Sequence, residues 1–288
     1  MWAVQLPLTL YGTEEQKSRY LPAICRGDMI AAHAITEPDF GSDAMSMTSR
    51  YVRDGDHYVL NGSKTFATNA PVADLVLAFA TVNPELRVAG ITGFLIERGT
   101  PGMTLSQPIK KMGLRTSPMG EVVFEDCRVP VENRLGREGE GNAVFNSAME
   151  WERACIFASH IGSMQRLMED CITYAKFRKQ FGQPISRMAP IADKIVDMKV
   201  SVEAGRLLLY RIGAIKDSGG SAVLESAIAK LFISEAHVQQ SLDAIQIHGG
   251  YGYSTETYAV AQVFLNGLSG NAAQWFDGTG HGCPIAGR

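Results

Sequence analysis

The sequence predicts an α+β protein in which a short helical segment precedes a small central β domain, and a helical bundle follows. Short apolar runs separated by Gly and Pro fill residues 29–130, whereas apolar residues recur every three or four positions after Gly141. Strands and helices are therefore segregated, which argues against an alternating dinucleotide-binding fold. The expected divisions are 1–28, 29–135, 136–253 and a tail, 254–288.

Composition narrows the functional classes. The chain has 288 residues, of which 45% are hydrophobic and 20% charged, as in a globular protein of one to three domains. The net charge of -3 argues against nucleic-acid binding, and no apolar run reaches the ~18 residues of a membrane helix. The five cysteines are scattered and the six histidines lie far apart, so we expect reduced thiols in a cytoplasmic protein and no metal site.

The N-terminal segment contains a signal for a helix start. Thr13 precedes two acidic residues and Gln16, a pattern typical of a capped first turn. The helix should run to about Arg26 and end at Gly27.

The next region reads as short strands. Residues 29–35 form an apolar run, and Asp54-Gly55 suits the turn of a hairpin between residues 51–53 and 57–60. Residues 75–81, 91–96 and 121–124 are further strands, and the set predicts a compact sandwich or barrel.

Three long helices are expected at about 142–177, 190–217 and 222–247, with a break at Ser218-Gly219-Gly220-Ser221. Their apolar stripes predict a bundle core together with contacts between subunits. The glycine-rich stretch 136–141 lacks the form of a phosphate-binding loop, and we interpret it as a flexible connection to the bundle.

The stretch from Ala34 to Asp43 is the first candidate site. Its strand ends at Pro38, and Gly41 permits a tight loop that carries Ser42. On the residues alone, this could equally be a polar loop without a ligand.

Several stretches together resemble the acyl-CoA dehydrogenase family of flavoproteins. The resemblance runs from about Tyr11 to Tyr253 and rests on the segments 11–22, 34–43, 60–69, 124–130, 177–182 and 246–253. It implies an N-terminal helical domain, here present only as a remnant, a middle β domain and a C-terminal four-helix bundle, with FAD between the last two. The family-unlike, glycine-rich residues 254–288 depart from that pattern.

The resemblance also implies roles for residues near the flavin ring. Ile35 and Thr36 would offer backbone and hydroxyl groups, and Phe66 would cover one ring face. Thr68 would hydrogen-bond near the nitrogen that receives hydride. Ser42 would contact the pyrophosphate or the thioester arm of the substrate.

The resemblance implies that the C-terminal motifs bind the FAD of a neighbouring subunit, and hence that the protein is a homodimer or homotetramer. Arg178 would bind the FAD pyrophosphate, and Phe181 belongs to the same motif. Gln246, Gly249 and Gly250 would approach the adenosine half. An exposed helix-end charge is the alternative interpretation of Arg178.

The implied reaction removes an α-proton from an acyl thioester, carried by CoA or a carrier protein, and passes the β-hydrogen to flavin as hydride. An electron-transferring flavoprotein or another oxidant would then accept the electrons. Glu152 is the expected base, as in the isovaleryl-CoA and long-chain branches, with Arg153 beside the substrate. Glu150 and Asp277 are weaker candidates for the base. A catalytically impaired homologue acting as a binding or assembly subunit is the alternative function.

Overall fold

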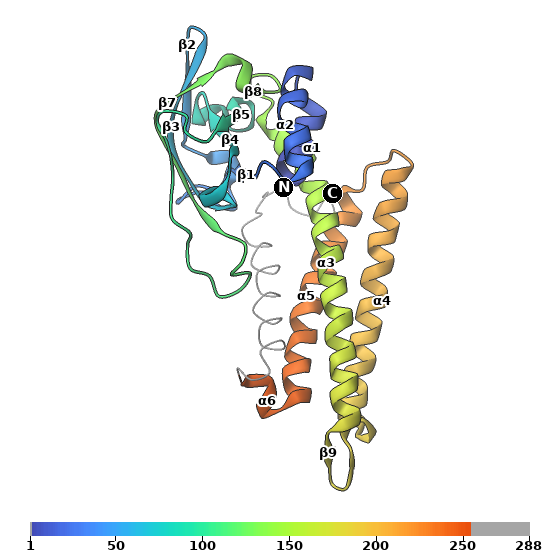
Figure 1. Ribbon diagram of the computed structural model, residues 1–288. Helices are drawn as coiled ribbons and strands as arrows, with labels where there is room; N and C mark the ends of the chain where they lie inside the picture. Colours follow the sequence, from blue (N-terminus) through green and yellow to red (C-terminus); the bar gives the residue numbers. More distant parts are fainter. Residues whose placement is uncertain (1, 255–288) are drawn as a thin grey trace. The chain divides into compact units, whose positions relative to one another are not determined.

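A computed structural model describes residues 2–254, apart from the side chain of Cys155. Asp277 and nearly all of the predicted tail, 254–288, therefore lie outside the described residues. The described chain forms two compact units (Figure 1). The first contains residues 2–111 and 115–152, and the second contains residues 112–114 and 153–254. The expected domain boundaries stay predictions, since the units follow packing and divide the long third helix.

Two helices open the first unit, α1 (Trp2–Tyr11) and α2 (Glu14–Arg26). The capping box predicted for α2 is confirmed: Gln16 N donates to Thr13 Oγ1 at 3.2 Å, and Thr13 N donates to Gln16 Oε1 at 3.1 Å. The helix ends at Gly27, whose φ of 82° is in the left-handed region.

An eight-stranded sheet forms the rest of this unit. Its strands follow the order β6-β7-β3-β2-β4-β5-β8, and β1 pairs in parallel with β4. The predicted hairpin at Asp54-Gly55 joins β2 to β3. The strands are β1 (Ala31–Ala34), β2 (Arg50–Asp54), β3 (His57–Thr68), β4 (Leu75–Thr81), β5 (Ile91–Glu97), β6 (Met103–Leu105), β7 (Met119–Pro130) and β8 (Arg134–Leu135). Short 3₁₀ helices lie at Ala44–Ser46, Ala70–Val72, Pro84–Gly90 and Val131–Asn133.

Strand β4 is buried along its whole length because both of its faces are covered. Leu75, Leu77 and Phe79 belong to a core that also contains buried side chains of α1, α2 and the start of α3. Val76 and Ala78 face a second core, which β4 and β5 share with β3 and β7. The sheet therefore encloses an interior of its own, as the sandwich or barrel prediction requires.

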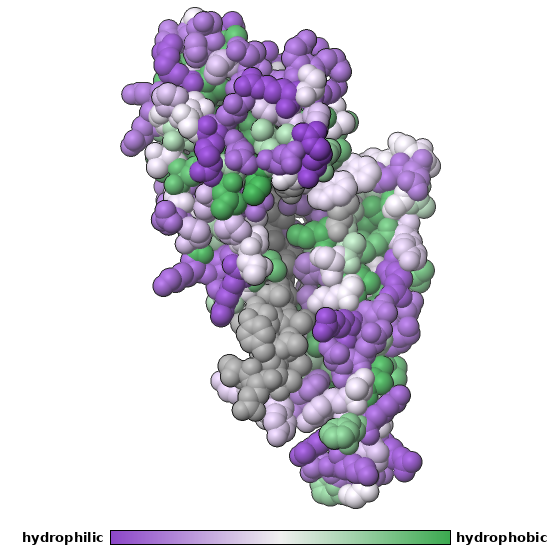
Figure 2. All heavy atoms as spheres, viewed as in Figure 1, coloured by the Kyte–Doolittle hydropathy of each residue, from purple (hydrophilic) through white to green (hydrophobic). Residues whose placement is uncertain are grey.

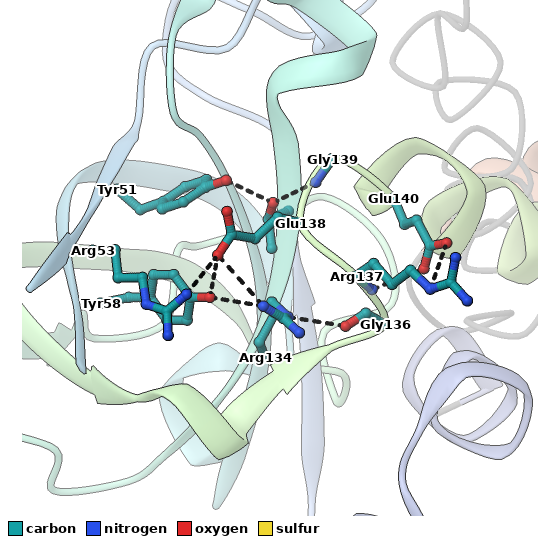
Figure 3. A network of polar contacts seen from close by, with 10 residues as sticks. Tyr51, Arg53, Tyr58, Arg134, Gly136, Arg137, Glu138, Gly139 and Glu140 are labelled. Carbon is teal, nitrogen blue, oxygen red and sulfur yellow. Dashed lines mark hydrogen bonds and ion pairs between the residues drawn. The ribbon is translucent and has the colours of Figure 1, made fainter. Parts of the chain in front are cut away.

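The glycine-rich connection after β8 is fastened to the sheet (Figure 3). Tyr58 donates its hydroxyl hydrogen to Glu138 Oε1 at 2.6 Å, and Arg134 Nη1 donates to the Tyr58 hydroxyl at 2.9 Å. The backbone N–H of Gly139 donates to Thr92 Oγ1 at 3.0 Å. The glycines alone predicted flexibility, but the acidic side chain between them supplies polar anchors that hold this loop.

Helices make up most of the second unit, which takes in the first of them from residue 153 onward, and their predicted spans are confirmed to within a few residues. They are α3 (Gly141–Phe177), α4 (Ala189–Asp217), α5 (Val223–His248) and the short α6 (Gly250–Tyr253). Between α3 and α4 lie the small strands β9 (Lys179–Gln180) and β10 (Gln183–Pro184) and a 3₁₀ turn at Ile185–Arg187. Side chains from α3, α4 and α5 fill two apolar clusters. Among the described helices, none is both long and apolar enough to cross a membrane.

Candidate functional site

The two motifs predicted to face the flavin ring lie side by side in the first unit. The backbone N–H of Thr65 donates to the carbonyl of Thr36 at 2.8 Å. The ammonium of Lys64 donates to the carbonyl of Ile35 at 3.2 Å. The end of β1 is therefore joined to the last third of β3, and residues 35–36 and 66–68 form one strip, called here the motif strip.

An irregularity in β3 shapes the motif strip. The pairing of β3 with β7 shifts register between Lys64 and Ala67, and Phe66 adopts a φ of 55°. A bulky side chain rarely adopts positive φ, and such strained positions cluster at functional sites. Phe66 is 48% exposed and Thr68 is exposed, whereas Ala67 between them is buried. An aromatic ring and a hydroxyl are thus available to a ligand on one side of the strand.

A buried ion pair lies under the motif strip. Lys64 Nζ is 2.8 Å from Glu37 Oε1, and the two side chains are 0% and 3% exposed. Burial lowers the pKa of Lys64, although the neighbouring carboxylate opposes that effect. Burial alone would raise the pKa of Glu37, but attraction to Lys64 and several hydrogen bonds outweigh it and lower that pKa. Both groups are therefore charged at neutral pH.

Ser42 lies in an exposed loop just before the 3₁₀ helix Ala44–Ser46. Its neighbour Asp43 accepts a hydrogen bond from the Ser46 hydroxyl at 2.6 Å and pairs with Arg87 at 3.1 Å. The loop is fixed by these contacts, so Ser42 is held in position and remains accessible.

Glu152 and Arg153 are consecutive, partly buried residues of α3. Glu152 lies about three turns from the start of the helix. It is also three to seven positions beyond Phe145, Ala148 and Met149, which are buried in the first core together with Ile35. Glu152 therefore continues the stripe of α3 that packs on the sheet, whereas Glu150 is roughly 200° around the helix from it.

In the second unit, an open pocket of about 570 Å³ brings two predicted motifs together. Arg178, from the end of α3, lines it together with Gly249 and Gly250, which follow α5. Two further residues predicted for this site do not line it. Phe181 lies in the turn between β9 and β10 and is 93% exposed, and Gln246 is exposed on the last turn of α5.

For most of the other residues that line this pocket the sequence predicted no role, and two of these contact each other. Tyr174 and His248 both line it, and their rings stack with centroids 4.3 Å apart. The Tyr174 hydroxyl also donates to the carbonyl of His248 at 3.4 Å, which joins the end of α3 to the end of α5. A signal was available, because Tyr174 lies four residues, about one helical turn, before Arg178, whose backbone N–H donates to the Tyr174 carbonyl at 2.8 Å.

Comparison with known families agrees with this arrangement. Residues 32–127 match the family described as "Acyl-CoA dehydrogenase, middle domain", and residues 139–280 match "Acyl-CoA dehydrogenase, C-terminal domain". The chain belongs to the acyl-CoA dehydrogenase family.

Several individual relatives and solved structures are similar over most of this chain. An L-prolyl-[peptidyl-carrier protein] dehydrogenase of Pseudomonas fluorescens is 44% identical over 87% of this chain, which spans 66% of that protein. A solved prolyl acyl carrier protein oxidase, AnaB, is 47% identical with a TM-score of 0.92, over 94% of this chain and 71% of that one. A structure titled "PigA with FAD and proline" is 40% identical, with a TM-score of 0.91, over 94% and 70%. The chain thus spans about two thirds of the length of these relatives.

Proposed function

We propose that this chain is an FAD-dependent dehydrogenase of an acyl thioester. The observation that carries the proposal is the motif strip, in which the end of β1 and the bulged end of β3 are hydrogen-bonded together. Exposed side chains of Phe66 and Thr68 flank backbone groups of Ile35 and Thr36 there. This set combines an aromatic face with hydrogen-bonding groups, as a planar heteroaromatic ring requires.

The pocket in the second unit would bind the adenosine diphosphate half of the FAD of a neighbouring subunit. Arg178 offers a forked cation for a pyrophosphate. A Cβ added at Gly249 or Gly250 would meet no protein atom within 4 Å, so these glycines leave room for a ligand to approach the backbone. Gln246 and Phe181 would contact that neighbouring cofactor from the borders of the pocket. Ser42 would contact the pyrophosphate of the FAD held at the motif strip of its own chain, or the thioester arm of the substrate.

Bound FAD supplies the two-electron acceptor for the hydride that leaves the β-carbon. We assign the α-proton to a carboxylate oxygen of Glu152, with Arg153 next to the substrate. The position of Glu152 on the sheet-packing stripe of α3 favours it over Glu150. Hydrogen bonds from the motif strip would orient the ring, and Phe66 would cover one of its faces.

We further propose that the acyl group is prolyl, or a similar small aminoacyl group, and that a carrier protein delivers it. The support is the activity of two relatives, at 44% and 47% identity, that act on prolyl groups held by carrier proteins. Coenzyme A is the alternative carrier, and an electron-transferring flavoprotein or another oxidant would reoxidise the flavin.

Assembly into a homodimer or homotetramer belongs to the same proposal. Exposed apolar residues recur along α4 at Val196, Val200, Leu207 and Tyr210, a spacing that puts them on one face. A similar stripe on α5 includes Leu224, Ile228 and Leu231. Apolar side chains interrupt the polar surface of the helical part in Figure 2. Subunit contacts at these stripes would remove that surface from water.

The deciding experiment is to purify the protein, reconstitute it with FAD and record its visible spectrum under anaerobic conditions. Prolyl-carrier protein should bleach the flavin band near 450 nm faster than prolyl-CoA or butyryl-CoA. Protein that stays colourless after reconstitution would refute the proposal and support a binding or assembly role. Bleaching by the CoA thioesters alone would refute the choice of carrier.

A further inference from the structure

We propose that the buried Glu37–Lys64 ion pair is a positioning device for the motif strip. The pair would set how the carbonyl of Ile35 and the bulge at Phe66 lie relative to each other, and thereby how tightly the strip holds a flavin ring. The inference rests on the proposed function, because the ring is the ligand for which the strip is positioned.

Every donor of Lys64 has a partner. Its ammonium lies 2.8 Å from Glu37 Oε1, 3.2 Å from the Ile35 carbonyl and 3.7 Å from Met47 Sδ. An ammonium has three N–H donors, and burying it is costly unless they are used. The ammonium is thus fixed by two segments at once, residues 35–37 at the end of β1 and Met47, and the first of these includes part of the motif strip.

Glu37 is held just as fully. Its carboxylate accepts hydrogen bonds from the backbone N–H of Thr48 at 2.7 Å, from the Thr48 hydroxyl at 2.8 Å and from the backbone N–H of Ser49 at 2.9 Å. The pair therefore links the end of β1, the chain just before β2 and the bulged part of β3.

The pair lies close in the sequence to Ile35, Thr36 and Phe66 of the motif strip. Glu37 follows Ile35 and Thr36 directly, and Lys64 is two residues before Phe66. A left-handed conformation at an aromatic residue persists only where the surroundings enforce it, and Lys64 and the Thr65 N–H are the contacts that join this bulge to β1.

Stability alone gives little reason for such a pair. Replacing both partners of a buried ion pair with uncharged residues of similar volume is often neutral or stabilising, whereas removing one partner is strongly destabilising. A double variant can therefore separate positioning from folding, because it leaves no buried charge unpaired.

The test uses the full chain and the double variant Glu37→Gln/Lys64→Met. Gln keeps one oxygen, which can accept from the two donors of Thr48 at the position of Glu37 Oε2. Met fills the space of Lys64 without its donors. The matched control is Asp54→Asn/Arg128→Met, which removes an exposed ion pair of 2.8 Å between β2 and β7 of the same sheet.

Three measurements are compared: the Kd for FAD by fluorescence quenching, the thermal unfolding midpoint, and hydrogen exchange in the FAD-free protein. The double variant should bind FAD at least tenfold more weakly than the parent. Exchange should accelerate in a peptide covering residues 61–70, which contains the Thr65 amide, and stay unchanged in a peptide covering β4. The unfolding midpoint should stay close to that of the parent, and the control should match the parent in all three.

Parental FAD affinity and parental exchange in the double variant would overturn the inference. A large fall in the unfolding midpoint with faster exchange across the whole sheet would also overturn it, because the ion pair would then stabilise the whole sheet and not position the motif strip. A parent that fails to bind FAD would refute the proposed function before any variant is made. In that case the predicted effect of the ion pair on FAD binding is refuted too. The hydrogen-exchange data alone then decide whether the ion pair orders the motif strip.

Discussion

His237 on α5 makes the stability of the helical unit depend on pH. Its side chain is 3% exposed, and neither ring nitrogen has a hydrogen-bond partner in the described structure. The ring lies edge-on to His160 of α3, with centroids 5.0 Å apart. Burial, with a smaller contribution from His160, lowers the pKa of His237 to about 4, and burial also lowers the pKa of His160.

The direction of the pH dependence follows from the number of protons that the folded and unfolded chains bind. Between the unfolded pKa of about 6.5 and the folded value of about 4, the unfolded chain binds more protons at His237 than the folded chain does. The free energy of unfolding therefore falls as the pH falls through this window, and the full stability is present above it. Linkage gives a loss of roughly 2 kcal/mol between pH 7 and pH 5, and roughly 3 kcal/mol below pH 4.

His237→Leu should remove this dependence. It should also stabilise the protein at pH 7, because two buried nitrogens without partners are replaced by methyl groups. Urea unfolding followed by circular dichroism at 222 nm, at pH 7 and pH 5, measures both effects. Gln239→Leu, which introduces leucine at an exposed position of α5 and removes one hydrogen bond to Asp243 but no imidazole, is the control. An unchanged pH dependence in His237→Leu, or an equal flattening in the control, would refute the reasoning.

Three further predictions concern the proposed function. Glu152→Gln should still bind FAD, but reduction of that FAD by the thioester should slow at least 10²-fold in stopped-flow absorbance, whereas Glu150→Gln should react at the parent rate. A slow Glu150→Gln beside a normal Glu152→Gln excludes Glu152 as the base. An inactive Asp277→Asn beside an active Glu152→Gln would identify Asp277 as the base. Gly250→Leu should weaken FAD binding about tenfold or more with little change in the unfolding midpoint, because its side chain extends into open space; normal binding argues against this pocket. Leu231→Asp should yield monomers in light scattering, and an unchanged oligomer shows that the stripe is not an interface.

Local signals in the sequence predicted the helices well. The capping residues Thr13 and Gln16 and the break at residues 218–221 depend on neighbours in the chain, so their effect can be derived without tertiary contacts. The Asp54-Gly55 turn was equally local. For the same reason, short strands such as β6 and β8 were missed, since only pairing with distant strands makes them extended.

The candidate site was predictable as a set of motifs, but its geometry was not. The positive φ of Phe66 arises from a register shift against β7, a strand more than fifty residues further along the chain. Lys64 sits in a polar stretch, and lysine is almost never fully buried, so its burial beside Glu37 could not be inferred from residue type. Family resemblance supplied roles for exposed residues and said nothing of the ion pair beneath them.

Strand β4 contributes alternate side chains to two separate cores, and this has a consequence for how the first unit opens. Ala78 lies between Leu77 and Phe79, which face one core, while its own side chain faces the other. Water can reach its amide only when both layers part, so a fluctuation that melts one layer leaves that hydrogen in place. Amide exchange at Ala78 should thus be among the slowest in the chain and report global unfolding. Strand β1 pairs with β4 from Ala31 to Ala34, and the motif strip begins at the next residue. The strip is therefore attached to the strand whose amides we expect to exchange most slowly.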